Sequence, residues 1–313
     1  MKKVIQHLGI TLGITLGIAA ALMATSPGVL ASEHWDKVEI KPIPLGAGLY
    51  MLMGNGGNMG LSIGEDGTFI IDDQYAPLAD KIQAAINGLS GNDLSGSSPR
   101  FLINTHWHGD HTGGNEHFGG GGTVIIAHEN VREALKGEKT IPLFNMHKPP
   151  SPKAALPVIT FSKEMSLHLN GDDLDLRHAP NAHTDGDALI IFKNANVIHM
   201  GDTFFNRMYP FIDVGSGGSI AGLIAAADQV LAIANDESKI IPGHGALANK
   251  ADLQAYRDML AEVESNIAEL LKAGKNADEI VDEWPTADFD GAWANGFLAA
   301  DVWVKIVVSS MQP

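Results

Sequence analysis

The sequence predicts an α/β fold in one large domain, on three observations. Short apolar runs suited to strands are mixed with stretches in which apolar residues recur every three or four positions, as in helices. The chain has 313 residues and is 45% hydrophobic, so it can bury a sizeable core. It has no cysteine, which excludes a disulfide framework, so its stability must come from that core.

The first 31 residues are typical of a secretory signal peptide. Met1-Lys2-Lys3 is basic, residues 8–23 are apolar and uncharged, and Val29-Leu30-Ala31 has the small residues of a cleavage site. Cleavage after Ala31 would leave a single domain over residues 32–313. A retained anchor helix is the alternative. We expect a periplasmic protein with no stable membrane association after cleavage.

Strands and helices are expected along the rest of the chain. The apolar runs that fit strands lie near residues 38–44, 48–53, 59–63, 68–71, 100–104, 122–126, 156–161, 172–177, 188–192, 196–200 and 238–241. Helices are expected over 77–89, 129–136, 219–234, 253–272 and 293–309, the last apolar enough to pack onto a sheet. Pro77 is tolerated in a first turn, and Ser219 after two glycines is expected to be an N-cap.

The charge balance bears on the class of ligand. The formal net charge is −16 and includes two lysines of the leader, so the mature chain would be near −18. Nucleic-acid binding needs clustered lysine and arginine, so this balance argues against nucleic acid. It favours a small neutral, zwitterionic or cationic substrate. The sequence leaves the oligomeric state open.

One hexapeptide, His106-Trp107-His108-Gly109-Asp110-His111, concentrates metal-ligating side chains after the apolar run Phe101-Leu102-Ile103. Residues two apart on an extended segment point the same way, so His106 and His108 can bind one metal ion. Asp110 and His111 can turn toward a second ion about 3.5–4 Å away, as in two-metal hydrolytic sites. The hexapeptide therefore predicts a metal site.

Two ions need further ligands from downstream, and without cysteine these must be His, Asp or Glu. Three candidates lie beside apolar runs in segments that contain glycine: His183, Asp202 and His244. Strand ends of this kind are where the active sites of layered α/β proteins gather.

Together these blocks, His-x-His-x-Asp-His, a lone His, an Asp and Gly-His-Gly, resemble the metallo-β-lactamase superfamily of metallohydrolases. The resemblance runs from about Val38 to His244 and is less distinct beyond. It implies a four-layer αβ/βα sandwich, in which two sheets pack face to face and helices cover them outside. It also implies a metal-dependent hydrolase with two zinc ions, although iron or manganese also suits ligands without thiolate.

The resemblance implies a role for each matching residue. The first metal would be held by His106, His108 and His183, the second by Asp110, His111 and His244, with Asp202 bridging the two. Asp72, after the run 68–71, matches an acidic residue that supports the metal loop, and Asp73 is the alternative. Two metals would lower the pKa of a shared water from about 15.7 toward neutrality, and the resulting hydroxide would attack an amide- or ester-type bond. Asp110 would orient that nucleophile or carry a proton.

The substrate is less defined. β-Lactamases of the closest architecture have a cysteine where Asp202 stands and a lysine shortly afterward; Arg207 is the one cation nearby. We expect a hydrolase with promiscuous β-lactamase activity, or alternatively a lactonase or glyoxalase II-like thioesterase. Outside the hydrolases, the alternative functions are a mononuclear iron oxygenase and a metal-binding protein. Arg207 and Asn58 are the candidate substrate contacts, and the segments 51–59 and 136–157 are candidate lids.

Overall fold

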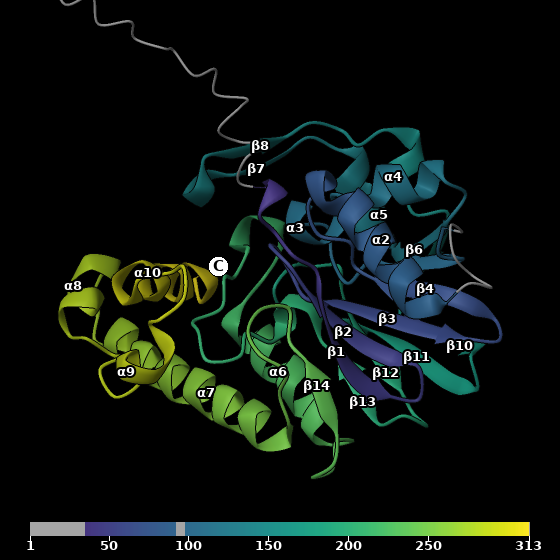
Figure 1. The fold of residues 1–313 in the computed structure, drawn as a ribbon. Helices are drawn as coiled ribbons and strands as arrows, with labels where there is room; N and C mark the ends of the chain where they lie inside the picture. The colour runs from purple at the N-terminus through teal and green to yellow at the C-terminus, as the bar shows by residue number, and fades with distance from the viewer. Residues whose placement is uncertain (1–34, 92–97, 313) are drawn as a thin grey trace, which may run out of the picture. The chain divides into compact units, whose positions relative to one another are not determined.

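The computed structural model describes residues 35–91 and 98–312, so the expected signal peptide lies outside the described residues. The chain divides into two compact units, Met1–Lys37 and Val38–Pro313, and the second contains every element given below (Figure 1). Within the described ranges, no helix has the length and hydropathy needed to cross a membrane.

Two sheets form the centre of the second unit. The first has the order β1-β2-β3-β4-β5-β6-β9, antiparallel up to β4 and parallel from there on. Its strands are β1 (Lys41–Gly46), β2 (Leu49–Met53), β3 (Met59–Gly64), β4 (Gly67–Ile71), β5 (Phe101–Ile103), β6 (Val124–His128) and β9 (Ile159–Phe161).

The second sheet has the order β10-β11-β12-β13-β14 and is antiparallel except for its last pair. Its strands are β10 (Glu164–Leu169), β11 (Asp172–Ala179), β12 (Asp187–Phe192), β13 (Val197–His199) and β14 (Lys239–Ile241). A separate hairpin joins β7 (Lys139–Ile141) to β8 (Met146–Lys148).

The inner faces of the two sheets bury one continuous apolar cluster. Met51, Ile71 and Ile103 of the first sheet join Leu174 and Ile190 of the second in this cluster. The rings of Phe69 and Phe192 stack across it, with centroids 6.3 Å apart. Alternate residues of a strand face opposite sides, so each sheet has a second apolar face, which helices must cover.

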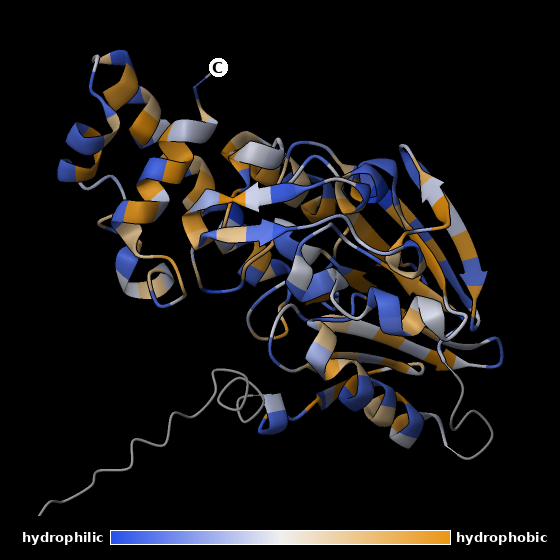
Figure 2. Cartoon of the chain, turned by 90° about the horizontal axis from the view of Figure 1, so that it is seen from above, coloured by the Kyte–Doolittle hydropathy of each residue, from blue (hydrophilic) through white to orange (hydrophobic). Residues whose placement is uncertain are grey.

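Helices lie outside the two sheets, and some of them cover the outer faces. Those between the strands of the first sheet are α2 (Ala79–Ser90), α3 (Gly109–Thr112), α4 (Asn115–Gly120) and α5 (Glu129–Lys136), and those that follow are α6 (Ile220–Leu231), α7 (Lys250–Lys272), α8 (Ala277–Asp282), α9 (Asp290–Trp293) and α10 (Ala300–Ser310). α4 and α5 contact β6, and α6 contacts β11. The helices carry both hydrophilic and hydrophobic residues (Figure 2). The predicted α/β sandwich is confirmed.

Most expected elements are present, and the exceptions have physical reasons. The helix expected over 293–309 is wrong in its first part: Trp293 ends α9, residues 294–298 form turns and bends, and α10 begins only at Ala300 and contacts α8. β10 was not expected because its residues alternate between exposed and half-buried at an edge of the sheet, so it has no apolar run. Ser219 is the N-cap of α6, as predicted, and accepts a hydrogen bond from the Gly222 N–H.

The long helix α7 begins at a capping box that can be tested. The Asn249 side chain accepts a hydrogen bond from the Asp252 N–H at 3.0 Å, and the Asp252 carboxylate accepts one from the Asn249 N–H at 3.3 Å. We expect Asn249→Ala to lower the free energy of unfolding by about 1 kcal/mol, because a helix N–H loses its acceptor. Thermal and urea unfolding measure this change. Gln254→Ala, an exposed change one turn further along, is the control and should alter stability by less than about 0.5 kcal/mol.

Candidate metal centre

The hexapeptide lies directly after β5 and changes conformation in its middle. His106 to His108 lead out of the strand, and α3 begins at Gly109. The turn of α3 directs Asp110 and His111 away from the path of the extended residues. Thr112 fixes this turn, because its hydroxyl donates hydrogen bonds to the carbonyls of Trp107 and His108. One short segment therefore presents ligands in two directions.

The other three candidates come from the second sheet. His183 precedes β12, Asp202 lies in the 3₁₀ turn Gly201–Thr203 after β13, and His244 follows β14. β12, β13 and β14 are neighbours in the sheet, so their ends bring these side chains together. A backbone bridge between Phe205 and His244 holds the last two loops side by side.

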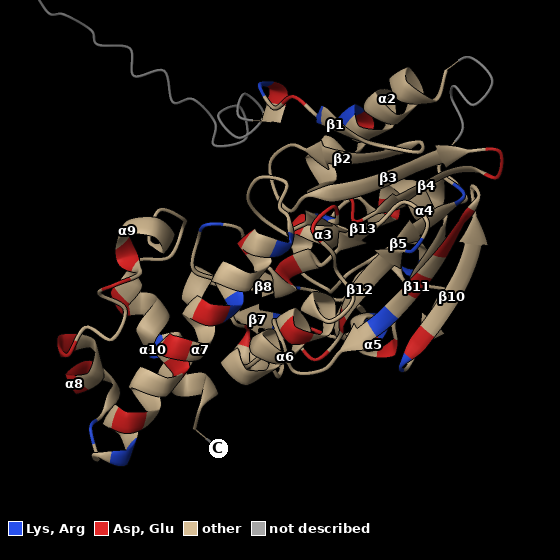
Figure 3. Ribbon diagram, turned by 90° about the horizontal axis from the view of Figure 1, so that it is seen from below, with Lys and Arg blue, Asp and Glu red and all other residues tan. Residues whose placement is uncertain are grey.

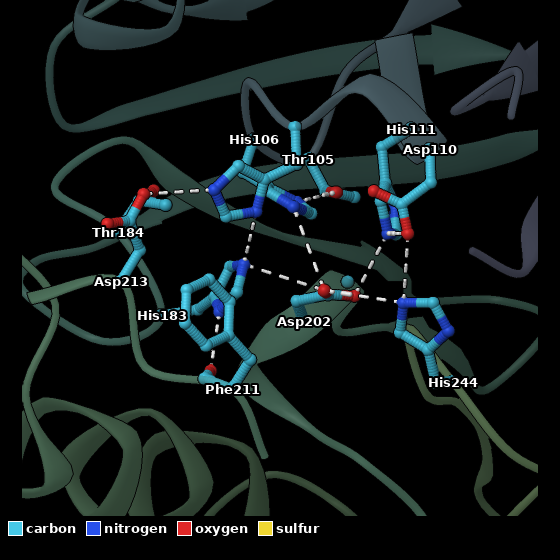
Figure 4. A network of polar contacts seen from close by, with 12 residues as sticks. Thr105, His106, Asp110, His111, His183, Thr184, Asp202, Phe211, Asp213 and His244 are labelled. Atoms are coloured by element: carbon cyan, nitrogen blue, oxygen red, sulfur yellow. Dashed lines mark hydrogen bonds and ion pairs between the residues drawn. The ribbon is translucent and has the colours of Figure 1, made fainter. Parts of the chain in front are cut away.

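The seven predicted ligands converge in two groups, and Figure 4 labels all of them except His108. In each group the potential ligand atoms lie within 4.8 Å of one another. The first group is His106, His108, His183 and Asp202, and the second is Asp110, His111 and His244. This division matches the one that the resemblance implies. It is a metal-binding arrangement of histidine and aspartate.

Asp202 lies between the groups. Its Oδ2 is 3.5 Å from His183 Nε2 on one side and 3.4 Å from His244 Nε2 on the other. Its Oδ1 is 3.0 Å from His111 Nε2. A carboxylate in this position can offer one oxygen to each of two ions.

Three buried atoms support the fit to metal. His106 Nε2, His111 Nε2 and Asp202 Oδ1 have no hydrogen-bond partner among the described residues, although His111 and Asp202 lie close enough for an ion pair. Buried polar atoms are normally satisfied, so such a convergence calls for a ligand. Imidazole nitrogen and carboxylate oxygen are donors that divalent zinc accepts.

Two glycines make the close approach sterically feasible. A Cβ at Gly57 would collide with the His111 ring, and a Cβ at Gly243 would collide with the Asp202 carboxylate. Gly57, in the loop between β2 and β3, also donates its N–H to the Asp110 carbonyl at 3.1 Å. The hairpin tip is therefore part of the wall of the site.

Asp72, rather than Asp73, supports the metal loop. Its carboxylate accepts hydrogen bonds from the Thr105 N–H at 2.8 Å and hydroxyl at 2.7 Å, and Oδ2 lies 2.7 Å from His111 Nδ1. This contact leaves His111 Nε2 facing the cluster. Asp73 instead accepts a hydrogen bond from the Gly114 N–H, and burial raises the pKa of its carboxyl. Asp72 has a φ of 58°, a left-handed conformation that is strained for aspartate and occurs at functional sites.

Two further acids orient ligands and were not assigned a role from the sequence. Asp213 Oδ2 lies 3.0 Å from His108 Nε2, which leaves His108 Nδ1 facing the first group. Asp187 accepts hydrogen bonds from the N–H groups of His183 and Thr184, at 2.7 and 2.8 Å, and so fixes the loop that carries His183. His183 Nδ1 in turn lies 2.7 Å from the Phe211 carbonyl.

Electrostatics at the site favour ionised acids. Burial opposes ionisation of Asp110, but the charge of His111 and the contact with His244 outweigh it and lower the Asp110 pKa to about 2. Burial likewise opposes charging of His244, but Asp202 and Asp110 raise its pKa to about 9. For His183 burial is dominant and lowers the pKa to about 4. The carboxylates therefore attract positive charge, and neutral His183 can act as a ligand.

A cavity of about 590 Å³ opens above the cluster, within the usual range for small-molecule sites. His108, Asp110, Asp202 and His244 line its floor, and Asp110 is 21% exposed. The walls are formed by Gly54, Asn55, Gly56, Tyr75, Ile141, Phe144, Met146, Phe211 and Phe297. Residues of both candidate lids, 51–59 and 136–157, are among them.

Neither of the two expected substrate contacts lines this cavity. The Asn58 amide donates hydrogen bonds to the Pro242 and Gly245 carbonyls, both at 2.9 Å, and the residue is buried. Asn58 thus holds the loop that carries His244. Arg207 pairs with Asp252 at 3.1 Å and lies over the Trp293 ring. The geometry gives no support to a substrate-binding role for either.

Comparison with known proteins places this geometry in a family. The model of the metallo-β-lactamase superfamily matches residues 53–244. No curated protein matches the chain. Among solved structures, DIM-1 metallo-β-lactamase superposes with a TM-score of 0.57 at 15% identity, over 72% of this chain and 99% of its own.

Two other structures share the fold. A metallo-β-lactamase from Pontibacter korlensis has a TM-score of 0.55 at 13% identity, over 71% of this chain and 99% of its own. The inverting sec-alkylsulfatase Pisa1 from Pseudomonas sp. has a TM-score of 0.65 at 17% identity, over 87% of this chain but 50% of its own. At these identities the structures establish the fold, and the family match covers the ligand blocks from the hexapeptide to His244. The chain therefore belongs to the metallo-β-lactamase superfamily.

Proposed function

We propose that the chain is an exported, dinuclear zinc hydrolase that opens amide- or ester-type bonds. The observation that carries this proposal is the pair of ligand groups with Asp202 between them, at the floor of a cavity of substrate size. Export is proposed from the leader at residues 1–31, and the periplasm is the compartment that follows in a bacterium.

The residues divide between two metal positions. His106, His108 and His183 would hold one ion, and Asp110, His111 and His244 the other, with Asp202 shared. Zinc is our choice for these nitrogen and oxygen donors, and iron or manganese also fits a set without thiolate. When bound, such ions polarise the substrate carbonyl and lower the pKa of a water molecule toward neutrality.

The protein's own groups then orient the attacking water and set the charge of the cavity. Asp110 is ionised and partly exposed at the cavity floor, so its carboxylate can accept a hydrogen bond from the attacking water and orient it. Tyr75 lines the same cavity, and burial, with the charges of Asp110 and Asp202, raises its pKa to about 12. Its phenol therefore remains neutral at neutral pH and adds no negative charge to the cavity.

Two substrate classes compete. β-Lactams are the first because two similar structures are β-lactamases. Lactones, esters and thioesters are the second, because an anchor for a β-lactam carboxylate is missing from the described lining, and Arg207 faces Asp252. The similar sec-alkylsulfatase adds sulfate esters to the bonds worth testing.

The first experiment is hydrolysis of a chromogenic cephalosporin and a thioester by the zinc-loaded protein. We expect Asp202→Ala to lower kcat/KM by more than ~100-fold, because both metal positions would lose a ligand. Removal of a residue that only orients a ligand typically costs up to ~100-fold. Asp236→Ala, at an exposed aspartate in the turn before β14, is the matched control. Full turnover by Asp202→Ala would exclude the proposed site.

Metal content separates the hydrolase from the mononuclear iron oxygenase. We expect about two zinc ions per chain after loading and dialysis, because seven donors converge in two groups. Elemental analysis gives the count directly. One iron per chain, bound in preference to zinc, would favour the oxygenase and contradict the dinuclear proposal.

Asp213 offers a test of ligand orientation. We expect Asp213→Ala to weaken zinc binding by about 10–100-fold, because His108 loses the partner that fixes its ring. Asp213→Asn retains an acceptor oxygen, so its effect should be smaller. Competition with a chromophoric chelator measures the affinity, and equal affinities for all three proteins would show that the contact is not used.

A further inference from the structure

Three phenylalanines form a continuous aromatic wall at the mouth of the metal cavity. The ring of Phe144, in the β7–β8 hairpin, lies 4.9 Å from Phe211 and 6.1 Å from Phe297, between centroids. These residues come from segments far apart in the chain, so only the fold brings them together. We call Phe144, Phe211 and Phe297 the aromatic wall.

The aromatic wall reaches both ligand groups. Phe211 lies 5.9 Å from the ring of His108 and 5.7 Å from that of His183. At the other end Phe297 lies 6.3 Å from the ring of His244. A substrate bound at the cluster would therefore lie against this wall, whichever metal position it approaches.

The cavity continues into an apolar groove. A second cavity of about 330 Å³ shares Ile141 and Phe211 with the metal cavity. Leu143, Val214, Val302 and Ile306 are among the side chains that line it. We call this second cavity the side groove. Phe211 separates it from the cluster, and Val302 and Ile306 of α10 line its other side.

The exposed apolar side chains around the two cavities indicate a ligand-binding surface. Leu143, Phe144, Met146 and Phe297 are 44%, 41%, 38% and 53% exposed, and all line one of the two cavities. Exposed apolar side chains gathered at one place mark binding sites. Ile233, which is 44% exposed, lines a separate cavity with the charged residues Arg177 and Lys193, so it does not extend the apolar surface beside the metal cluster.

Charge around the site argues for an uncharged substrate tail. The described lining of the metal cavity contains no lysine or arginine. Lys305 lines the side groove but is paired with Asp278 at 2.7 Å. Acidic side chains prevail on α7, α8 and α9 (Figure 3). A carboxylate on the tail of a substrate would lose its hydration here without finding a cation.

We propose that this hydrolase acts on uncharged esters or lactones with a hydrocarbon chain, and that the aromatic wall and the side groove bind this chain. The proposal rests on the proposed function. One water is consumed: its oxygen adds to the carbonyl carbon, the single bond from that carbon to the alkoxy oxygen breaks, and the products are a carboxylate, an alcohol group and a proton. The wall sets specificity and takes no part in this step.

The test is a chain-length series of p-nitrophenyl esters, from acetate through butyrate to octanoate, with the zinc-loaded protein. Each buried methylene contributes about 0.8 kcal/mol, or about fourfold. We expect kcat/KM to rise at least tenfold from acetate to octanoate. Mono-p-nitrophenyl suberate, which ends in a carboxylate, should lose this gain. A flat series, or equal rates for suberate and octanoate, would overturn the proposal.

Variants locate the effect. Phe144→Ala and Leu143→Asp change exposed side chains of the hairpin, so both should fold. We expect each to lower the octanoate-to-acetate ratio at least fivefold, whereas Ile233→Ala, an equally exposed apolar change elsewhere, should keep the wild-type ratio. An unchanged octanoate-to-acetate ratio in both hairpin variants would show that the hydrocarbon chain of the substrate binds outside the aromatic wall and the side groove.

Binding of 1-octanol and 1-butanol, measured by isothermal titration, separates this inference from the proposed function. If no ester or lactone is hydrolysed but octanol binds more tightly than butanol, and Phe144→Ala removes the difference, the apolar subsite stands and the hydrolase fails. If esters are hydrolysed but the two alcohols bind equally, the hydrolase stands and the subsite fails. Saturation at two protein chains per octanol would instead mean that the apolar mouth binds a second copy.

Discussion

The structure depends on one costly feature, the burial of the Asp202 carboxylate among imidazoles. Asp202 is 5% exposed and approaches rings from both ligand groups. An isolated buried carboxylate would be strongly destabilising, so positive charge must gather around it. In the protein alone the imidazoles of His111 and His244 supply that charge, and burial of these rings opposes it. Divalent ions would supply the charge without protonating any ring, which is the physical case for metal at this site.

Holding these ligands requires a rigid surround, and both sheets contribute to it. Asp72 at the end of β4 orients His111, whereas Asp213 and Asp187, associated with the second sheet, orient His108 and the His183 loop. The Asn58 amide ties the hairpin tip to the loop of His244. The geometry of the cluster is therefore a property of the whole sandwich. The apolar cluster between the sheets therefore supports the site as well as the fold, because it holds together the two sheets that carry the ligands.

The sequence predicts features whose signal is local and misses those assembled across the chain. The hexapeptide is recognisable because its ligands are adjacent, and the order of the later blocks carries His183, Asp202 and His244 through the family resemblance. Asp213 has no such signal, because it contacts His108 from 105 residues away. The aromatic wall is missed for the same reason. Arg207 shows the converse error. It lies close to Asp202 in sequence, which suggests a place in the substrate site. Its backbone has a positive φ, and its side chain pairs with Asp252 and does not line the metal cavity.

The division between floor and rim bears on the substrate class that we propose. The ligand groups at the floor would determine the chemistry, since every substrate bound there would meet the same residues. The rim comes from the β2–β3 loop, the β7–β8 hairpin and the segment before α10. The β2–β3 loop is tied to the floor by hydrogen bonds of Gly57 and Asn58, whereas Phe144 and Phe297 contribute ring contacts. The side chains of the hairpin can therefore change without breaking a hydrogen bond to the floor. Under our proposal, selectivity depends on which part of a substrate the rim removes from water, and an aromatic rim without a basic residue in its described lining would favour a hydrocarbon over a carboxylate.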